Sequence, residues 1–296
     1  MLNLPTYILI TPARNEAQFI ELAIKSVIAQ TVRPLKWIIV SDGSTDGTDE
    51  MVGRYAADNQ WIELLRMPER RERHFAGKVH AFNAGYLRVK ALPFDVIGNL
   101  DGDVSFDDRD YFAFLMNKFA ENARLGVAGT PYQEKGGARS RFKSPEHVSG
   151  ACQMFRRECF EDIGGYAPIR TGGIDLIAFL SAQAKGWETR TFEEKICLHH
   201  RKGGSGQNAG TFRRLLQLGK VDYLHGSHPG FEVFRCIYRM KNKPYLIGGV
   251  LMLVAYFWAM LHGIERTVPE ELVELRRSDQ LQRLKNALLH PLRHGD

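Results

Sequence analysis

Apolar residues in the first 135 positions alternate between short continuous runs and longer stretches with helical spacing. Short runs rich in β-branched side chains are typical of buried strands, and apolar residues that recur every three or four positions are typical of helices. This alternation predicts βαβ units, and therefore an α/β fold with a mostly parallel central sheet flanked by helices. The expected strands are 7–10, 37–40, 62–65, 95–100 and 126–130, and the expected helices are 19–28 and 79–89.

The second half of the chain is less regular, and its pattern predicts a helical C-terminal extension. A helix is expected over 175–185, after two glycine pairs that indicate turns. A polar, basic region follows at 199–243, and residues 245–261 then form a 17-residue run without a formal charge. The tail at 265–293 spaces leucines between charged residues, which is the pattern of an amphipathic helix.

Polar clusters directly follow three of the predicted strands. They are TPARNE at 11–16, SDGSTDGT at 41–48 and DGD at 101–103. Ligands of open α/β sheets bind in the crevice beyond the carboxyl ends of the strands. A purely structural α/β protein does not need acidic clusters at several strand ends, so the pattern predicts a binding site there.

The DGD triplet is a candidate metal site. Asp101 and Asp103 stand two residues apart after a buried strand, where both carboxylates can reach one cation. Magnesium and manganese prefer oxygen ligands and commonly join protein carboxylates to substrate phosphates. A short acidic triplet also occurs in ordinary turns, so the triplet alone leaves both interpretations open.

Two further positions also have a structural and a functional interpretation. Asp42 could accept hydrogen bonds from a nucleoside, or could form a turn before the next helix. Lys78 stands near the start of a predicted helix, where its charge could reach a diphosphate, although most lysines are simply solvated. The residues themselves do not decide between these interpretations.

Taken in order, TPARNE, VSDGSTDGT, GKVHAFNAG and NLDGD resemble the signature of glycosyltransferase family 2. SGACQMFRRECFEDIGGY further along resembles the acceptor-side segment of that family, and the resemblance covers roughly residues 5–200. It implies a GT-A fold and transfer of a sugar from a nucleotide-diphosphate donor to an acceptor hydroxyl. It also implies a divalent metal, magnesium or manganese, and a role in the synthesis of bacterial polysaccharide or glycolipid.

The resemblance assigns roles to matching residues. The implied nucleotide-sugar-binding residues are Pro12, Ala13, Glu16, Asp42, Lys78, Asn83 and Asp101, and the implied metal ligand is Asp103. In the family, an acidic pair that opens a helix after a glycine turn provides the catalytic base. Asp175 matches the second acid of this pair, whereas Ile174 replaces the first. The implied reaction is a direct displacement with Asp175 as the base, which inverts the anomeric configuration.

His199, His200 and Arg201 follow the predicted strand ICL and precede Lys202. Family members often have a basic or aromatic motif here that closes over the diphosphate. In this chain the sequence is HHRKGGSG, so these residues match the family motif by their position in the chain and not by their sequence. The three residues are candidate phosphate contacts, or a histidine supplies a second metal ligand. A single histidine is also often structural.

Composition and charge bear on the cellular environment in which the protein is expected to work. The four cysteines form no CxxC pair, which predicts four reduced thiols, and the N-terminus lacks the pattern of a signal peptide. Residues 201–296 carry a net charge of +7, from 15 basic and 8 acidic residues. The remaining 200 residues have a net charge of −1. The basic part is either a solvated surface or a region attracted to anionic lipid.

The apolar run at 245–261 has two interpretations. It is near the lower length limit of a membrane-spanning helix, and basic residues precede it, so it could span or dip into a membrane with the catalytic part on the cytoplasmic face. Alternatively, it is a buried helix that packs on the protein. The membrane interpretation predicts a membrane-associated enzyme whose acceptor is a saccharide or a lipid-linked molecule, with no nucleic-acid partner.

The expected organisation is a catalytic domain at 1–200, with a nucleotide-binding half at 1–104 and an acceptor half at 105–200. A basic connecting segment at 201–243, a hydrophobic helix at 244–263 and an amphipathic tail at 264–296 would follow. One rival is a sugar nucleotidyltransferase, which would need a Gly-rich basic loop after the first strand. Another is a non-catalytic nucleotide-sugar-binding or membrane scaffold protein, which Ile174 favours. No GxGxxG follows the first strand, which disfavours a dinucleotide oxidoreductase.

Overall fold

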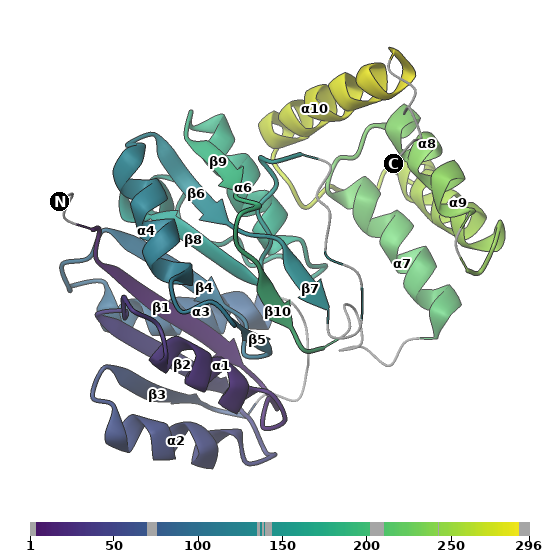
Figure 1. Cartoon of the computed structure of the whole chain (residues 1–296). Coiled ribbons are helices and arrows are strands. Elements are labelled where there is room, and N and C mark those ends of the chain that lie inside the picture. The colour runs from purple at the N-terminus through teal and green to yellow at the C-terminus, as the bar shows by residue number, and fades with distance from the viewer. Residues whose placement is uncertain are drawn as a thin grey trace. The chain divides into compact units, whose positions relative to one another are not determined.

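The structure is a computed structural model (Figure 1). The chain forms two compact units, residues 1–205 and residues 206–296. The structure describes residues 4–69, 76–134, 137, 139, 144–201, 210–241 and 243–289.

The first unit is built on a seven-stranded sheet. The sheet is mostly parallel, as predicted, and it contains two strands, β8 and β9, that were not predicted. Its strand order is β3-β2-β1-β4-β8-β6-β9. Only β8 runs antiparallel to its neighbours, β4 and β6, and the other pairs are parallel. In sheet order the strands are β3 (Ile62–Met67), β2 (Lys36–Asp42), β1 (Tyr7–Ala13), β4 (Val96–Leu100), β8 (Cys152–Arg156), β6 (Leu125–Gly129) and β9 (Glu188–Thr191).

Helices cover both faces of this sheet, because side chains of a strand point alternately to its two sides. Leu9 of β1 packs in one core cluster with Ile20 and Ile24 of α1. The next residue, Ile10, faces α3, where a Cβ on Gly85 would lie only 2.8 Å from the Ile10 side chain. The helices are α1 (Ile20–Ile28), α2 (Thr48–Asp58), α3 (Ala76–Val89), α4 (Tyr111–Glu121), α5 (Arg157–Asp162) and α6 (Ile174–Ala184).

A second, three-stranded sheet lies in the same unit and was not predicted. It has the order β5-β10-β7, with β5 at Val104–Ser105, β10 at Cys197–His199 and β7 at Tyr132–Glu134. β10 runs antiparallel to β5, and His199 pairs with Val104. This pairing places His199 beside the end of the DGD triplet, although almost a hundred residues separate them in sequence.

The second unit consists of helices in the part that the structure describes (Figure 1). They are α7 (Thr211–Leu224), α8 (Pro229–Arg239), α9 (Ile247–Leu261) and α10 (Glu270–Leu289). Glycines permit close packing at two crossings, because a Cβ on Gly219 of α7 would collide with Met252 of α9, and one on Gly249 of α9 with Cys236 of α8. The region from 199 to 243 therefore contains two helices, α7 and α8, that its polar pattern did not reveal.

The apolar run at 245–261 forms α9, a helix of 15 residues. One side of α9 is buried, including Met252, Tyr256 and Ala259. Of the helices within the described ranges, none combines the length and the apolar character that crossing a bilayer would require.

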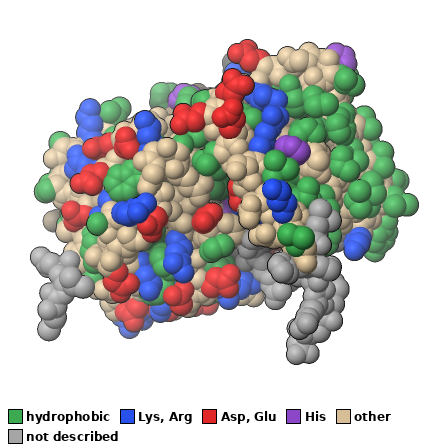
Figure 2. All heavy atoms as spheres, turned by 90° about the horizontal axis from the view of Figure 1, so that it is seen from above, with side chains coloured by type: hydrophobic (Ala, Val, Ile, Leu, Met, Phe, Trp, Pro, Cys, Tyr) green, Lys and Arg blue, Asp and Glu red, His purple; other side chains and the backbone are tan. Residues whose placement is uncertain are grey.

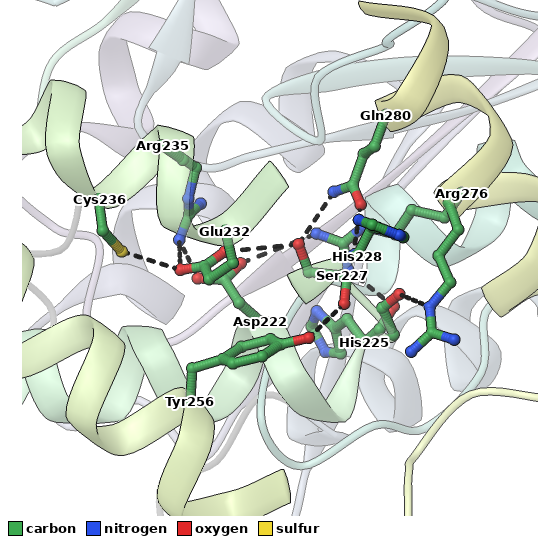
Figure 3. Close-up of polar contacts among 12 residues, drawn as sticks. Asp222, His225, Ser227, His228, Glu232, Arg235, Cys236, Tyr256, Arg276 and Gln280 are labelled. Atoms are coloured by element: carbon green, nitrogen blue, oxygen red, sulfur yellow. Dashed lines mark hydrogen bonds and ion pairs between the residues drawn. The ribbon is translucent and has the colours of Figure 1, made fainter. Parts of the chain in front are cut away.

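A buried polar network joins the four helices of the second unit (Figure 3). Glu232 of α8 has no solvent-exposed surface, and it accepts hydrogen bonds from Ser227 and Cys236 and pairs with Arg235. Ser227 in turn accepts a hydrogen bond from Gln280 of α10 through its hydroxyl and one from Tyr256 of α9 through its carbonyl. Such a network fixes the helices because each buried polar group is costly to leave unpaired.

Candidate active site

The predicted polar clusters lie at one edge of the large sheet. Ala13 is the last residue of β1, Asp42 is the last residue of β2, and Asp101 directly follows β4. β1 lies between β2 and β4 and is parallel to both strands. The three residues therefore stand at neighbouring carboxyl ends, where ligands of open α/β sheets bind.

The predicted nucleotide-binding residues of this edge lie at the ends of β1 and β2. Pro12 is half-buried in β1, and Asp42 is buried at the end of β2. The Oδ2 atom of Asp42 lies 3.9 Å from Nη1 of Arg14, which the sequence analysis did not select. The backbone N–H of Glu16 donates to the hydroxyl of Thr48, which holds the loop after β1 against the start of α2.

Asp101, Asp103 and His199 form a group that suits a divalent cation. Each offers one potential ligand atom, and these atoms all lie within 4.8 Å of one another. Carboxylate oxygens are suitable ligands for magnesium and manganese. Imidazole nitrogen is a common ligand of first-row transition-metal ions, the series to which manganese belongs. The donor set therefore fits the expected metal. His199 comes from β10 and the aspartates follow β4, so two parts of the fold build the group.

The ring of His199 is held in an orientation that suits metal binding. Its Nδ1 atom makes a hydrogen bond with the backbone carbonyl of Arg201. A carbonyl can only accept, so Nδ1 carries the proton, and Nε2 is the atom that faces Asp103, at 3.6 Å from Oδ1. Metal-binding histidines are commonly fixed in this way by a partner on the second ring nitrogen. Tyr132 of β7 packs against the same ring.

Asp103 is buried in a setting that disfavours its negative charge. Burial, followed by the nearby carboxylate of Asp101, raises the pKa of Asp103, and the positive charges near it offset this only in part. The Nε atom of Arg201 lies 3.5 Å from Asp103, and Nη2 of Arg201 lies 2.5 Å from the carboxylate of Glu16. A bound cation would relieve the repulsion between the two aspartates, which supports the assignment of a metal site here.

Lys78 contacts the other aspartate of the triplet. Its ammonium group lies 2.5 Å from Oδ1 of Asp101. Burial by itself would lower the pKa of Lys78, but the charge of Asp101, with smaller effects from Asp175 and Asp103, raises it. Lys78 therefore remains a cation next to the predicted metal ligands, where a diphosphate would need positive charge.

Asp175 lies in the first turn of α6, and the backbone of Gly150 orients it. The N–H of Gly150 donates to Oδ2 of Asp175 at 3.1 Å. A Cβ on Gly150 would lie 3.0 Å from the Cβ of Asp175, so glycine leaves space for the carboxylate. Ile174, in the position of the missing acid, is buried in the core at 6% exposure. An ionised carboxylate would be costly at that position, which gives a physical reason for the apolar residue.

Two buried amide side chains join Asp101 to Asp175, and the sequence analysis missed both. The Nδ2 group of Asn99 donates to Oδ1 of Asp101 and to the carbonyl of Gly150. Its neighbour across the sheet, Gln153, donates to the backbone carbonyl of Asp175 and accepts from Tyr166. The available signal was the presence of polar residues inside otherwise apolar strands, which indicates a fixed hydrogen-bonding role.

Two predicted residues lie apart from the carboxylates. His200 stacks on Phe19 and makes a hydrogen bond with Ser105, and it does not belong to the group of Asp101, Asp103 and His199. Asn83 is exposed on α3. Lys202 lies outside the described residues. Of the two histidines, the structure therefore brings His199 to the acidic pair.

A mostly parallel sheet with an acidic pair directly after β4 is the GT-A arrangement of nucleotide-sugar transferases. Residues 8–170, more than half of the chain, match the model of the family described as "Glycosyl transferase family 2". The chain belongs to this family of glycosyltransferases, as its motifs predicted.

Curated relatives match this chain over part of its length. A poly-beta-1,6-N-acetyl-D-glucosamine synthase of Staphylococcus aureus is 28% identical over an alignment of 171 residues, gaps included, that covers 51% of this chain and 39% of that protein. The synthase of the same name from Staphylococcus epidermidis is 23% identical over 175 residues. The chain thus spans about two fifths of the length of these relatives.

Solved structures share the fold at low identity. A mannosyltransferase from Pyrobaculum calidifontis, in complex with GDP-Man and Mn²⁺, has a TM-score of 0.57 and 19% identity, over 98% of this chain and 82% of that one. S. aureus TarS 1–349, in complex with UDP-GlcNAc, has a TM-score of 0.55 and 12% identity, over 94% and 81% of the two chains. These likenesses confirm the predicted GT-A fold.

Proposed function

We propose that this protein is an inverting, metal-dependent glycosyltransferase that moves a sugar from a nucleotide-diphosphate donor to an acceptor hydroxyl. One observation carries the proposal: Asp101, Asp103 and His199 converge at the sheet edge, with the Lys78 cation beside them. Asp175 is linked to the same place through Gly150 and Asn99. Family membership supports sugar transfer as the class of reaction. The residues named above support a metal site, a cation and a base for that reaction.

In the proposed mechanism, Asp175 accepts the proton of the acceptor hydroxyl as the hydroxyl oxygen attacks the anomeric carbon. The bond from that carbon to the diphosphate oxygen breaks on the opposite face, so the configuration inverts. When bound at Asp101, Asp103 and His199, magnesium or manganese supplies positive charge to the leaving diphosphate. Lys78 adds a fixed cation on the same side.

Arg201 is the proposed mobile partner of the diphosphate. Its guanidinium lies over the ring of Phe19 and pairs with Glu16 and Asp103. Arginine binds phosphate oxygens through two parallel hydrogen bonds, so a diphosphate can replace these carboxylates as its partner. The nucleotide itself would lie over Pro12, Ala13, Glu16 and Asp42, with Asn83 on the donor side.

The proposed acceptor is a saccharide or a lipid-linked molecule of polysaccharide or glycolipid synthesis, at the cytoplasmic face of a membrane. The names of the curated relatives support the polymer, because they are synthases of an N-acetylglucosamine polysaccharide. The basic residues that precede α9 support the location, because such segments are attracted to anionic lipid.

A transfer assay with a panel of UDP- and GDP-sugars tests the proposal. The purified chain would be supplied with manganese and a crude membrane fraction as the source of acceptor. We expect transfer from one donor, lost with Asp175→Asn but with donor binding retained. Binding of a donor without transfer by the wild type would instead favour a non-catalytic nucleotide-sugar-binding protein. Release of pyrophosphate from a nucleoside triphosphate and a sugar phosphate would favour a nucleotidyltransferase.

A further inference from the structure

Helix α9 has two apolar sides, and the residues that the structure describes bury only one of them. Its small and buried residues, among them Gly248, Gly249 and Ala259, face the interior of the second unit. Its other side presents Ile247, Val250, Val254, Trp258 and Leu261 to solvent, with exposed fractions between 47% and 80%. These residues recur every three or four positions, so they form one stripe along the helix.

The connection from α8 to α9 continues this apolar surface. Ile237 and Tyr238 near the end of α8 are exposed, and so are Tyr245 and Leu246 just before α9. Figure 2 shows hydrophobic side chains gathered over the part of the second unit that α8 and α9 form. We call this set the α8–α9 surface: Ile237, Tyr238, Tyr245, Leu246, Ile247, Val250, Val254, Trp258 and Leu261.

The exposed charges of the segment 210–261, which contains the α8–α9 surface, are of one sign, and the next exposed acid along the chain is Glu265. Between residues 210 and 261 the sequence has seven basic residues and only two acidic residues, Asp222 and Glu232. Both acids are buried in the polar network of the second unit, where they pair with arginines (Figure 3). Lys241 and Lys243 are exposed beside the apolar connection from α8 to α9. The exposed charge here is therefore positive.

We propose that the α8–α9 surface docks the protein onto an anionic lipid bilayer, with α9 lying in the interface. An apolar helix side bordered by lysines and by aromatic residues such as Tyr238, Tyr245 and Trp258 is the chemistry of an interfacial membrane helix. The inference gives the proposed membrane location a definite contact surface. It does not depend on sugar transfer, so the two proposals can fail separately.

Charge favours a bilayer over a second copy of this chain as the occupant. In a symmetric dimer the same patch would face itself. The same segment of the second copy would offer Lys241 and Lys243 no exposed acid, because Asp222 and Glu232 are buried, so a dimer would leave their charge uncompensated. An anionic leaflet instead supplies the opposite charge, together with an apolar layer for the stripe.

Vesicle flotation of the full-length protein tests the proposal. The probes are vesicles of pure phosphatidylcholine, and vesicles of phosphatidylcholine and phosphatidylglycerol in equal parts. We expect strong binding to the anionic vesicles, weakened by salt, and weaker binding to the vesicles of pure phosphatidylcholine through the apolar stripe. The variant Lys241→Gln/Lys243→Gln should lose about 5-fold in affinity per lysine, since each basic residue near the surface contributes on the order of 1 kcal/mol. Ile247→Asp/Val254→Asp should reduce binding to both kinds of vesicle.

Matched controls separate the surface from general effects of charge and folding. Leu87→Asp places the same acid on an exposed leucine of α3, and Lys90→Gln/Lys185→Gln removes two exposed lysines of the first unit. Both should bind vesicles like the wild type. Because all substituted residues are exposed, circular dichroism should show unchanged folding.

Three outcomes would overturn the proposal. The first is that the wild type binds neither kind of vesicle. The second is that the control variants lose as much binding as the α8–α9 variants. The third is that light scattering finds a dimer that Ile247→Asp/Val254→Asp converts to a monomer without a change in vesicle binding, which would assign the surface to self-association.

Discussion

The two aspartates of the DGD triplet have different surroundings, and these suggest how the site accepts a cation. Asp101 contacts a lysine and an amide donor, Lys78 and Asn99. Asp103 is more deeply buried, and its pKa is raised. In the absence of metal, the second carboxylate therefore carries its charge at a cost in folding free energy.

This imbalance predicts that Asp103→Asn stabilises the metal-free protein. Because the pKa of Asp103 is higher in the folded state than in the unfolded chain, its charge destabilises the fold at neutral pH, and this cost disappears as the pH falls through the folded-state pKa. Removing the charge should raise the Tm by about 2–4 °C, as expected for on the order of 1 kcal/mol in a protein of this size. Thermal unfolding in the presence of chelator measures this, and a lower Tm would contradict it.

Gly150 gives a second prediction at the residue scale. A Cβ in Gly150→Ala would lie 3.0 Å from Asp175, so the carboxylate must shift. We expect the transfer rate to fall on the order of 100-fold, because small misplacements of reacting groups are costly, whereas the Kd of the donor should stay unchanged. Steady-state kinetics and calorimetry measure the two quantities. Gly53→Ala is the control, since a Cβ on Gly53 meets nothing within 4 Å. Equal losses in both variants would exclude a positioning role for Gly150.

At the scale of elements, the large sheet was predictable and the small one was not. Strands such as β1 and β2 contain runs of buried apolar residues, at 7–10 and 37–40, which sequence patterns reveal well. The predicted strand ICL at 196–198 overlaps β10, but β5 has only two residues, too few for any pattern. Their pairing, which brings His199 to Asp103, was therefore not evident from the sequence. β8, with the sequence CQMFR, was not among the predicted strands, because Gln153 interrupts its apolar pattern.

The positions of His199 and His200 at the small sheet predict different effects of replacing each histidine. His199→Ala should weaken manganese binding by roughly 10–100-fold, which is the range measured when residues that support a metal site are replaced. His200→Ala should leave manganese affinity unchanged but lower the stability by about 1 kcal/mol, through the loss of the contacts with Ser105 and Phe19. Manganese titration and urea unfolding distinguish the two effects. A manganese loss in His200→Ala, with none in His199→Ala, would reverse the assignment.

At the scale of the whole molecule, the chain separates into an α/β unit and a helical unit of different character. The order of motifs predicted the first unit and the sheet edge at which Ala13, Asp42 and Asp101 meet. It could not predict the amide bridge from Asp101 to Asp175, because that bridge depends on contacts between strands distant in sequence. In the second unit, α7 and α8 were hidden in a polar region, since their buried acids and glycines do not form an apolar pattern.

The buried network of the second unit predicts a pH dependence of stability. Burial raises the pKa of Asp222 to about 6, and Arg235 and Arg276 offset this only in part. Because this value lies above the pKa of an unfolded aspartate, the charge of Asp222 costs stability above about pH 6, and the cost disappears as the pH falls toward 4. The stability of the wild type relative to Asp222→Asn should therefore increase on acidification, by on the order of 1–3 kcal/mol. Urea unfolding of both proteins across this pH range measures the difference, and a constant difference would contradict the prediction.

The central claim is that the carboxylates at the end of β4 bind a nucleotide sugar through a divalent metal. Calorimetry tests this claim most directly. A panel of nucleotide-sugar donors is titrated into the wild type and into Asp103→Asn, first with manganese and then with chelator. The account predicts that one nucleotide-diphosphate sugar binds in the presence of manganese, and that both the chelator and the substitution abolish this binding. Donor binding of equal strength in all of these conditions would contradict the account.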